Sequence, residues 1–165
     1  MITFPLTSLV TLMICLLMLA TGVHVGRARG RYGIKAPAIS GHEMFERAYR
    51  IQMNTLENAA IVLPALWVNA AFISDRGAAM LGTVWLASRI WYALAYHHEP
   101  AKREPAFVLS MIAFTLLWLA AAYLLLLAAH LSSSRIHHQL PRWRVPPLHR
   151  NAGWPNSKAL HTNSC

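Results

Sequence analysis

Residues 45–58 read FERAYRIQMNTLEN, and this charged, amide-rich run leads directly into the apolar segment 59–73. On a helix, Arg50, Asn54 and Glu57 lie four and three residues apart, so their side chains share one face. Ionisable groups at a membrane boundary are costly unless they pair with each other, with another helix or with a polar ligand. The stripe therefore indicates either a network of salt bridges that joins helices or a binding site for a polar ligand.

The composition is that of a membrane protein. Of the 165 residues, 56% are hydrophobic and 13% are charged, whereas about a quarter of the residues in a soluble domain are charged. The net charge of +9 comes from basic residues that lie mainly at the edges of the apolar blocks and in the C-terminal segment. This placement suits anionic lipid head groups, or an anionic ligand near the interface, better than nucleic acid. We therefore expect membrane lipids, and no nucleic acid, among the partners.

The cysteines and histidines do not form a pattern typical of a metal or redox site. Cys15 lies in an apolar run and Cys165 is far from it in the sequence, so there is no disulfide framework and no metal-ligand spacing. His97, His98 and Glu99 are adjacent and cannot all face one ion from a regular helix. We expect neither a bound metal ion nor a cysteine nucleophile.

The apolar blocks predict an all-α, integral membrane four-helix bundle in residues 1–131. Its helices are expected at about 2–26, 45–73, 78–97 and 106–130. Residues 1–26 contain no charged side chain, and their long apolar run lacks a basic segment before it, so we expect a retained first helix rather than a cleaved signal peptide. From residue 132 the chain loses its periodicity, which predicts a flexible basic tail over 132–165.

The connecting segments set the expected topology. Residues 27–37 read RARGRYGIKAP, which predicts a basic loop broken by glycine and proline, with at most one last helical turn through Arg29. Residues 74–77 read SDRG and predict a tight turn, so the second and third helices should be antiparallel neighbours. Pro64 should kink the second helix, because its ring removes one backbone hydrogen bond. Four spans place the loops after the first and third helices on the same side of the membrane, but basic residues flank both sides, so charge alone does not orient the chain.

A second polar face lies near the end of the third helix. Arg89, Tyr92 and Tyr96 are spaced three and four residues apart, which puts them on one side of a helix. Tyrosines at this depth are common in the aromatic belt of a membrane interface. The expected topology brings this face to the same side of the membrane as the stripe in residues 50–57. The convergence of two polar faces favours a ligand site over a simple anchor.

The stripe is part of a longer motif that resembles a known family signature. Residues 45–57 follow the pattern F-E-R-x-Y-R-x-Q-x-N-x-x-E, residues 89–96 follow R-x-x-Y-x-x-x-Y, and Arg103 comes after them. In this order, on four expected spans, the motifs resemble the MAPEG family, the membrane-associated proteins of eicosanoid and glutathione metabolism. The resemblance is strongest to the branch that holds leukotriene C4 synthase and the microsomal glutathione S-transferases, and it covers about residues 5–130.

This resemblance implies a homotrimer in the bacterial inner membrane or the endoplasmic reticulum. Glutathione, the co-substrate, would bind between neighbouring subunits in a site that faces the cytosol. By position in the motif, glutathione binding is assigned to Arg29, Arg50, Gln52, Asn54, Glu57, Tyr92 and Tyr96. The catalytic role, which is to stabilise the glutathione thiolate, is assigned to Arg103.

The chemistry of glutathione agrees with these residue types. Guanidinium groups suit its two carboxylates through charge-assisted hydrogen bonds, and the carboxylate of Glu57 suits its ammonium group. A guanidinium in a partly desolvated site favours the thiolate over the thiol. The implied function is that of a glutathione-dependent membrane transferase, in which the thiolate attacks a lipophilic electrophile or reduces a lipid hydroperoxide.

Two positions depart from the leukotriene C4 synthase pattern. Gly30 stands where that enzyme has a second arginine, and Asn58 stands where it has a tyrosine, so a broader transferase or peroxidase is favoured over strict leukotriene synthesis. The alternative is a non-enzymatic lipid-binding scaffold of the same family, of the 5-lipoxygenase-activating type, which lacks the arginine matched by Arg103. A small transporter or channel would need a polar path through the whole bilayer, and the polar residues instead cluster at one depth.

Overall fold

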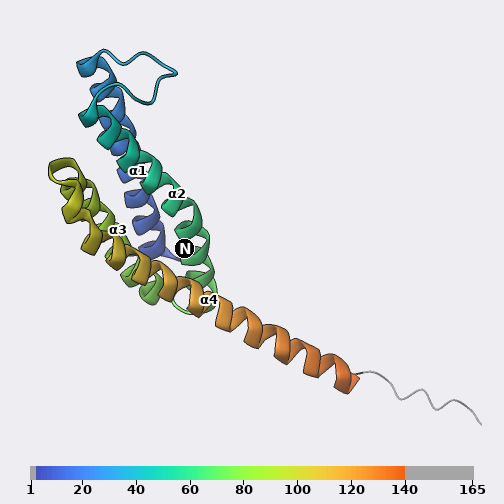
Figure 1. Cartoon of the computed structure of the whole chain (residues 1–165). Coiled ribbons are helices and arrows are strands. Elements are labelled where there is room, and N and C mark those ends of the chain that lie inside the picture. The colour runs from blue at the N-terminus through green and yellow to red at the C-terminus, as the bar shows by residue number, and fades with distance from the viewer. Residues whose placement is uncertain (1–2, 140–165) are drawn as a thin grey trace, which may run out of the picture. The chain divides into compact units, whose positions relative to one another are not determined.

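The computed structural model describes residues 3–139, and every regular element in that range is helical (Figure 1). In chain order the elements are α1 (Pro5–Tyr32), α2 (Glu43–Phe72), α3 (Asp75–His98), the short 3₁₀ helix η1 (Pro100–Arg103) and α4 (Glu104–Gln139). Residues up to His130 form one compact unit, and Leu131 begins a second one. The predicted all-α, four-helix fold is confirmed.

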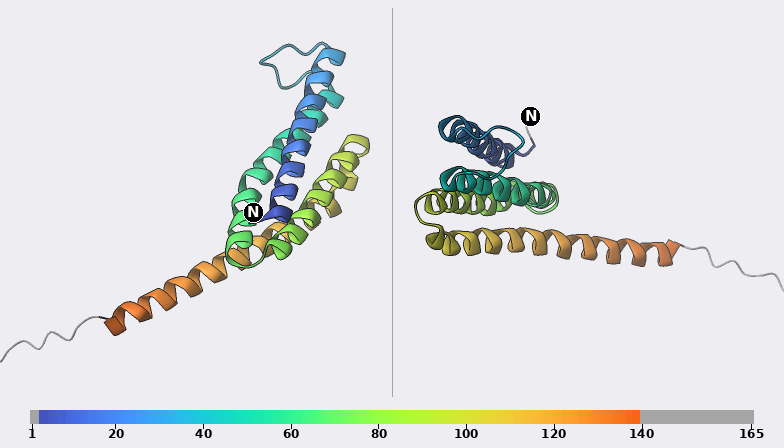
Figure 2. Two further views of the ribbon diagram at one scale, coloured as in Figure 1. Left: turned by 180° about the vertical axis from the view of Figure 1, so that it is seen from behind. Right: turned by 45° about the horizontal axis from the view of Figure 1, so that its top comes forward.

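Three of the described helical segments are long and apolar enough to cross a membrane. They are Pro5–Tyr32, Glu43–Phe72 and Pro100–Leu131. The remaining helix, α3, is also long, but it carries Asp75, Arg76 and Arg89. It contacts both α1 and α2, and the three helices run alongside one another within the first unit (Figure 2).

The predicted loop at residues 27–37 starts later than expected, because the helix extends beyond the one turn allowed through Arg29. Helix α1 continues through the basic run to Tyr32 and ends at Gly33, whose backbone has a φ of 66° and whose N–H donates to the carbonyl of Arg29. Glycine adopts this left-handed conformation without the steric cost of a Cβ. Arg29 and Arg31 therefore lie in the last turn, where basic side chains interact favourably with the helix dipole.

The predicted turn at residues 74–77 is instead the start of α3. The hydroxyl of Ser74 accepts a hydrogen bond of 3.3 Å from the backbone N–H of Gly77, which caps the helix. Because α2 ends at Phe72, the chain reverses over a very short connection, and the antiparallel pairing of α2 and α3 is confirmed.

The boundaries of the fourth helix also differ from the expected ones. Helix α4 starts at Glu104, directly after η1, and continues past the expected end to Gln139. The first residues of the predicted tail at 132–165 are therefore helical, and residues 140–165 lie outside the described part of the chain.

The main core receives side chains from all four long helices. Ile14, Leu66, Trp85 and Leu117 come from α1, α2, α3 and α4 respectively, and all are fully buried. Gly82 on α3 allows the helices to approach closely. A Cβ built on Gly82 would lie 2.8 Å from Cδ1 of Leu66 and 2.9 Å from Cγ1 of Val10.

The start of α1 is fixed by α3 rather than by its own capping residue. Phe4 provides no side-chain cap, but the carboxylate of Asp75 accepts hydrogen bonds from the backbone N–H groups of Leu6 (3.1 Å) and Thr7 (2.9 Å). These N–H groups have no acceptor within the first turn of a helix. The contact places the starts of α1 and α3 together, so the end of α1, the start of α2 and the end of α3 lie at the opposite end of the bundle.

Candidate functional site

A cavity of about 990 Å³ lies at this opposite end of the bundle. Its walls come from α2, α3, η1, the first turn of α4 and the connection between α1 and α2. Six of the eight predicted site residues line it: Arg50, Asn54, Glu57, Tyr92, Tyr96 and Arg103. The prediction that the polar faces of the second and third helices meet is confirmed.

The wall from α2 presents unpaired charge. Arg50 and Glu57 are exposed in the single chain, and no ion pair or hydrogen bond within residues 3–131 uses the charged end of either side chain. The described residues therefore do not form a salt-bridge network along the stripe of Arg50, Asn54 and Glu57. The side chains of Arg50 and Glu57 are free to contact a ligand or a neighbouring subunit.

The wall from α3 and η1 combines aromatic rings with a cation. The rings of Tyr92 and Tyr96 stack with centroids 5.7 Å apart, as expected for side chains one helical turn apart. Helix α3 ends at His98, and η1 brings the guanidinium carbon of Arg103 to 4.6 Å from the centroid of the Tyr96 ring. This cation–π contact orients the guanidinium at the edge of the cavity.

A buried arginine lies directly behind the wall. Arg89 is fully buried, and its Nη2 donates to Oδ1 of Asn54 (2.7 Å) and to the hydroxyl of Thr55 (3.3 Å). Its guanidinium carbon lies 4.3 Å from the centroid of the Tyr92 ring. The sequence places Arg89 on the polar face of the third helix, but it gives this residue no role in the site.

The connection between α1 and α2 covers part of the cavity. Ile39 and Ser40 contribute to the lining. The carboxylate of Glu46, itself a lining residue, accepts from the backbone N–H of Gly41 at 3.0 Å. This bond ties the connection to the start of α2.

Two predicted site residues do not reach this cavity. The Nη1 of Arg29 donates to the carbonyl of Ala38 at 2.8 Å, and its guanidinium carbon lies 4.8 Å from the centroid of the Phe45 ring. Gln52 points toward α1, where a Cβ built on Gly22 would lie 3.2 Å from its Nε2. Six of the predicted binding residues therefore line the cavity, whereas Arg29 and Gln52 lie on another side of α2.

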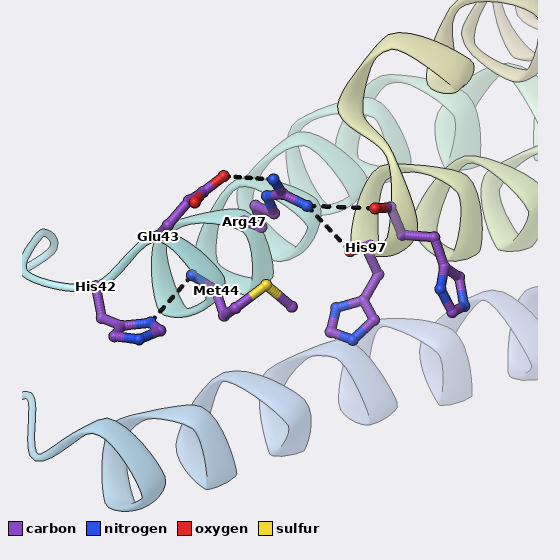
Figure 3. Close-up of polar contacts among 6 residues, drawn as sticks. His42, Glu43, Met44, Arg47 and His97 are labelled. Atoms are coloured by element: carbon purple, nitrogen blue, oxygen red, sulfur yellow. Dashed lines mark hydrogen bonds and ion pairs between the residues drawn. The ribbon is translucent and has the colours of Figure 1, made fainter.

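Arg47, another motif residue, fastens α2 to the end of α3. It pairs with Glu43 one turn earlier, and its Nη1 donates to the backbone carbonyls of His97 (3.3 Å) and His98 (3.4 Å) (Figure 3). These carbonyls belong to the last turn of α3, where helical acceptors lack intrahelical partners. Arg47 is therefore part of the framework that holds the cavity walls together.

The family is decided by comparison with known proteins. The model of the MAPEG family matches residues 7–123. The chain belongs to the MAPEG family. All six cavity-lining residues of the motif, together with Arg29 and Gln52, fall inside the matched range, and the resemblance stated from the motifs is confirmed.

Relatives of this MAPEG protein include proteins of Synechocystis, Dictyostelium and mammals. An uncharacterized protein of Synechocystis sp. is 42% identical over 69% of this chain and 83% of its own length. Leukotriene C4 synthase of Cavia porcellus is 35% identical over 78% of this chain and 85% of its own length. Microsomal glutathione S-transferase 2 of Bos taurus is 34% identical over 61% of this chain and 68% of its own length.

The two departures from the synthase pattern lie outside the cavity lining of this MAPEG chain. Asn58 donates from Nδ2 to the carbonyl of Asn54 at 2.8 Å, within its own helix. Gly30 is exposed on the last turns of α1, and a Cβ built there would meet nothing within 4 Å. Neither residue therefore supplies a polar group to the cavity in place of the arginine or the tyrosine.

Proposed function

We propose that this MAPEG protein is a microsomal-type glutathione S-transferase that activates the glutathione thiolate for attack on lipophilic electrophiles. The observation that carries the proposal is the cavity itself, in which two arginines, three carboxylates, an amide and three tyrosines from separate helices surround one space. Relatives named as glutathione transferases support the same activity. The proposed setting is the bacterial inner membrane or the endoplasmic reticulum, with the cavity facing the cytosol.

The free side chains of the α2 wall suit the charges of glutathione. Its two carboxylates each accept two parallel hydrogen bonds from a guanidinium, which Arg50 offers without a competing partner among the described residues. Its ammonium group suits the carboxylate of Glu57. The volume of about 990 Å³ is at the upper end of the range for small-molecule sites, which leaves room for a second substrate.

Arg103 is the proposed catalytic residue. An ordinary thiol has a pKa of roughly 8.5, so only a small fraction is ionised at neutral pH. A guanidinium beside the sulfur lowers that pKa, and each unit corresponds to about 1.4 kcal/mol of preference for the thiolate. The thiolate sulfur then bonds to the electrophilic carbon. The leaving group departs with its electron pair, or an opened epoxide oxygen takes up a proton.

The separation of the predicted ligands supports a site shared between subunits of a homotrimer. Arg50 and Glu57 are exposed on a helix that is apolar enough to cross a membrane, and exposed charges are costly in lipid. A neighbouring subunit that covers this face of α2 would remove them from lipid. Arg29 and Gln52, which do not reach the cavity of their own chain, would then contribute to a neighbour's site.

The position of Arg103 favours an enzyme over the lipid-binding scaffold. The scaffold branch lacks this arginine, whereas here its guanidinium lies at the cavity edge. The same thiolate could reduce a lipid hydroperoxide. Its sulfur would take one peroxide oxygen and release an alcohol, and a second glutathione would displace water to give the disulfide.

The test is a titration of glutathione into purified full-length protein in detergent micelles. We expect saturable binding heat and an increase in the ultraviolet absorbance of the thiolate at neutral pH. A halogenated nitrobenzene and a lipid hydroperoxide, assayed separately, then distinguish conjugation from peroxide reduction. Folded protein that gives neither heat nor thiolate absorbance would refute the proposed function.

A further inference from the structure

Arg89 is a buried cation without a counter-charge. Its side chain has 0% exposed surface, and no carboxylate within residues 3–131 forms an ion pair with it. A buried guanidinium in a low-dielectric environment is destabilising unless hydrogen bonds and nearby negative charge compensate it. The Nε and Nη1 of Arg89 have no hydrogen-bond acceptor among the described residues, so this compensation is incomplete in the single chain.

The one strong contact of Arg89 reaches the wall of the glutathione cavity. Its Nη2 lies 2.7 Å from Oδ1 of Asn54, and Asn54 lines the cavity. Tyr92, which lies under the guanidinium carbon at 4.3 Å, lines the cavity as well. Arg89 therefore contacts two lining residues without lining the cavity itself.

This contact fixes the orientation of the Asn54 amide. A guanidinium only donates hydrogen bonds, so the amide oxygen of Asn54 must face Arg89. The amide nitrogen then faces away from Arg89, and no acceptor within residues 3–131 takes a hydrogen bond from it. A ligand carboxylate or peptide carbonyl in the cavity can accept a hydrogen bond from this amide nitrogen. In the opposite orientation the amide oxygen would face the ligand, and an oxygen cannot donate to a carboxylate or carbonyl.

The charges around the cavity also call for another cation. The charged lining residues are Arg50, Arg103, Glu46, Glu57 and Glu104, so carboxylates outnumber guanidinium groups by three to two. Glutathione carries two carboxylates and one ammonium group, and its thiolate form is more negative still. The uncompensated charge of Arg89, directly behind the wall, shifts this balance in favour of an anionic ligand.

We propose that Arg89 is a positioning residue for glutathione binding. It holds the Asn54 amide with its nitrogen toward the cavity, so that Asn54 donates to a carboxylate or carbonyl oxygen of the bound tripeptide. This inference rests on the proposed function and adds to it a residue that acts through Asn54 without touching the ligand.

The experiment is a double-mutant cycle on glutathione affinity, measured by calorimetry on folded, full-length protein in detergent micelles. Arg89→Met and Asn54→Ala should each weaken binding by about tenfold, because each removes the same oriented donor. The double variant should bind no more than about twofold more weakly than the weaker single variant. Arg89→Lys retains a donor for Oδ1 of Asn54 and should bind at least about threefold more tightly than Arg89→Met.

Ser88→Ala is the matched control. Ser88 is the adjacent buried polar residue of α3, and its hydroxyl donates only to the carbonyl of Trp85 in the same helix. The Ser88→Ala protein should bind glutathione with the same affinity as the wild type. An equal loss of affinity in Ser88→Ala and Arg89→Met would show that Arg89 contributes only to general packing. Losses that multiply in the double variant, to about a hundredfold, would also refute the proposal.

Folding and function are tested separately in this design. If Arg89→Met does not fold, Arg89→Lys replaces it in the cycle, with a smaller loss expected but the same failure to multiply with Asn54→Ala. Wild-type protein that does not bind glutathione at all would overturn the proposed function, and the role of Arg89 with it. Wild-type binding with an unaffected Arg89→Met would overturn the role of Arg89 alone.

Discussion

The guanidinium carbon of Arg103 lies 4.6 Å from the centre of the Tyr96 ring. Helix α3 ends shortly after Tyr96, and the 3₁₀ helix η1 turns the chain so that Arg103 comes back over the ring. A cation over an aromatic face keeps its N–H donors at the edge of the guanidinium, where an anion can accept them. The contact therefore orients a cation at the cavity without neutralising it.

Arg103→Ala should lower turnover by about a hundredfold while it weakens glutathione binding by about threefold. The larger loss is expected because this guanidinium acts on the developing thiolate, where removal of one stabilising group typically costs about 10²–10³ in rate. Steady-state turnover with a halogenated nitrobenzene and calorimetric titration of glutathione measure the two effects.

Lys102→Ala is the control for Arg103→Ala. Lys102 lies next to Arg103 in η1, but it is exposed and pairs with Glu99 at 2.7 Å. The Lys102→Ala substitution removes one positive charge from the same short helix, as Arg103→Ala does. Turnover of this variant should stay within about twofold of wild type, because exposed ion pairs contribute little. Equal rates for wild type and Arg103→Ala would remove the catalytic assignment.

Arg47→Met should lower the free energy of unfolding by about 1 kcal/mol. The change leaves the carbonyls of His97 and His98 without the donor that crosses from α2 (Figure 3). Because the two contacts are long and share the Nη1 of Arg47, together they should contribute as much as one ordinary hydrogen bond, about 0.5–1.5 kcal/mol. Denaturant unfolding of the protein in micelles measures the loss.

Glu43→Gln separates this contact from the ion pair within α2. Glu43 has a largely exposed carboxylate that pairs with Arg47, and an exposed pair of this kind contributes about 0.3–0.5 kcal/mol. The substitution should therefore have a smaller effect than Arg47→Met. An equal or larger loss in Glu43→Gln would show that the ion pair, and not the link to α3, is what Arg47 contributes.

The spacing of residues along the second helix was sufficient to predict the α2 wall of the site. Arg50, Asn54 and Glu57 share one helical face in any regular helix, and the cavity is lined by all three. The same spacing puts Gln52 on a flanking face of this helix, in agreement with its position toward α1. It could not place Arg29, which lies on another helix. The side chain of Arg29 is directed by the carbonyl of Ala38, an acceptor that the chain supplies only after it has turned back.

Local signals also misjudged two helix ends. Residues 27–37 predicted a loop, with at most one helical turn through Arg29, because the run is basic and contains glycine and proline, yet the helix continues to Tyr32 and stops at Gly33. At residues 74–77 the same residue types form a cap and the first turn of α3 rather than a turn between helices. Glycine marks a helix end only where the backbone is left-handed, and Gly33 is such a position whereas Gly30 is helical.

Asn69→Leu should lower the free energy of unfolding by about 0.5–1.5 kcal/mol. The buried Nδ2 of Asn69 donates to the carbonyls of Ala65 in its own helix and of Leu117 in α4, both at 2.7 Å. Side-chain hydrogen bonds between membrane helices contribute about 0.6 kcal/mol on average and up to about 1.7. Unfolding in micelles, followed by helix content, measures the change.

Thr83→Ala is the matched control for Asn69→Leu. The hydroxyl of Thr83 donates only to the carbonyl of Ala79, one turn earlier in α3, at 2.7 Å. Because this bond joins no second helix, we expect a change within about 0.5 kcal/mol. A loss in Thr83→Ala as large as that in Asn69→Leu would show that the bond to α4 carries no special stability.

Gly82→Val should be the most destabilising of these substitutions, with a loss of about 1–3 kcal/mol. Even a single added Cβ would lie within 3 Å of Leu66 and Val10, and both side chains belong to the buried core where α1, α2 and α3 meet. Overpacking of a close-packed core forces side chains out of their preferred rotamers or moves the backbone.

Gly26→Ala, on the C-terminal half of α1, should instead raise the free energy of unfolding. A Cβ built on Gly26 meets nothing within 4 Å, so the gain in helix propensity, about 0.5–1 kcal/mol in an exposed helix, should raise the stability of the fold. Both variants are compared with wild type by denaturant unfolding in the same micelles. A Gly82→Val protein as stable as wild type would mean that α3 does not approach α1 and α2 as closely as the clash distances require.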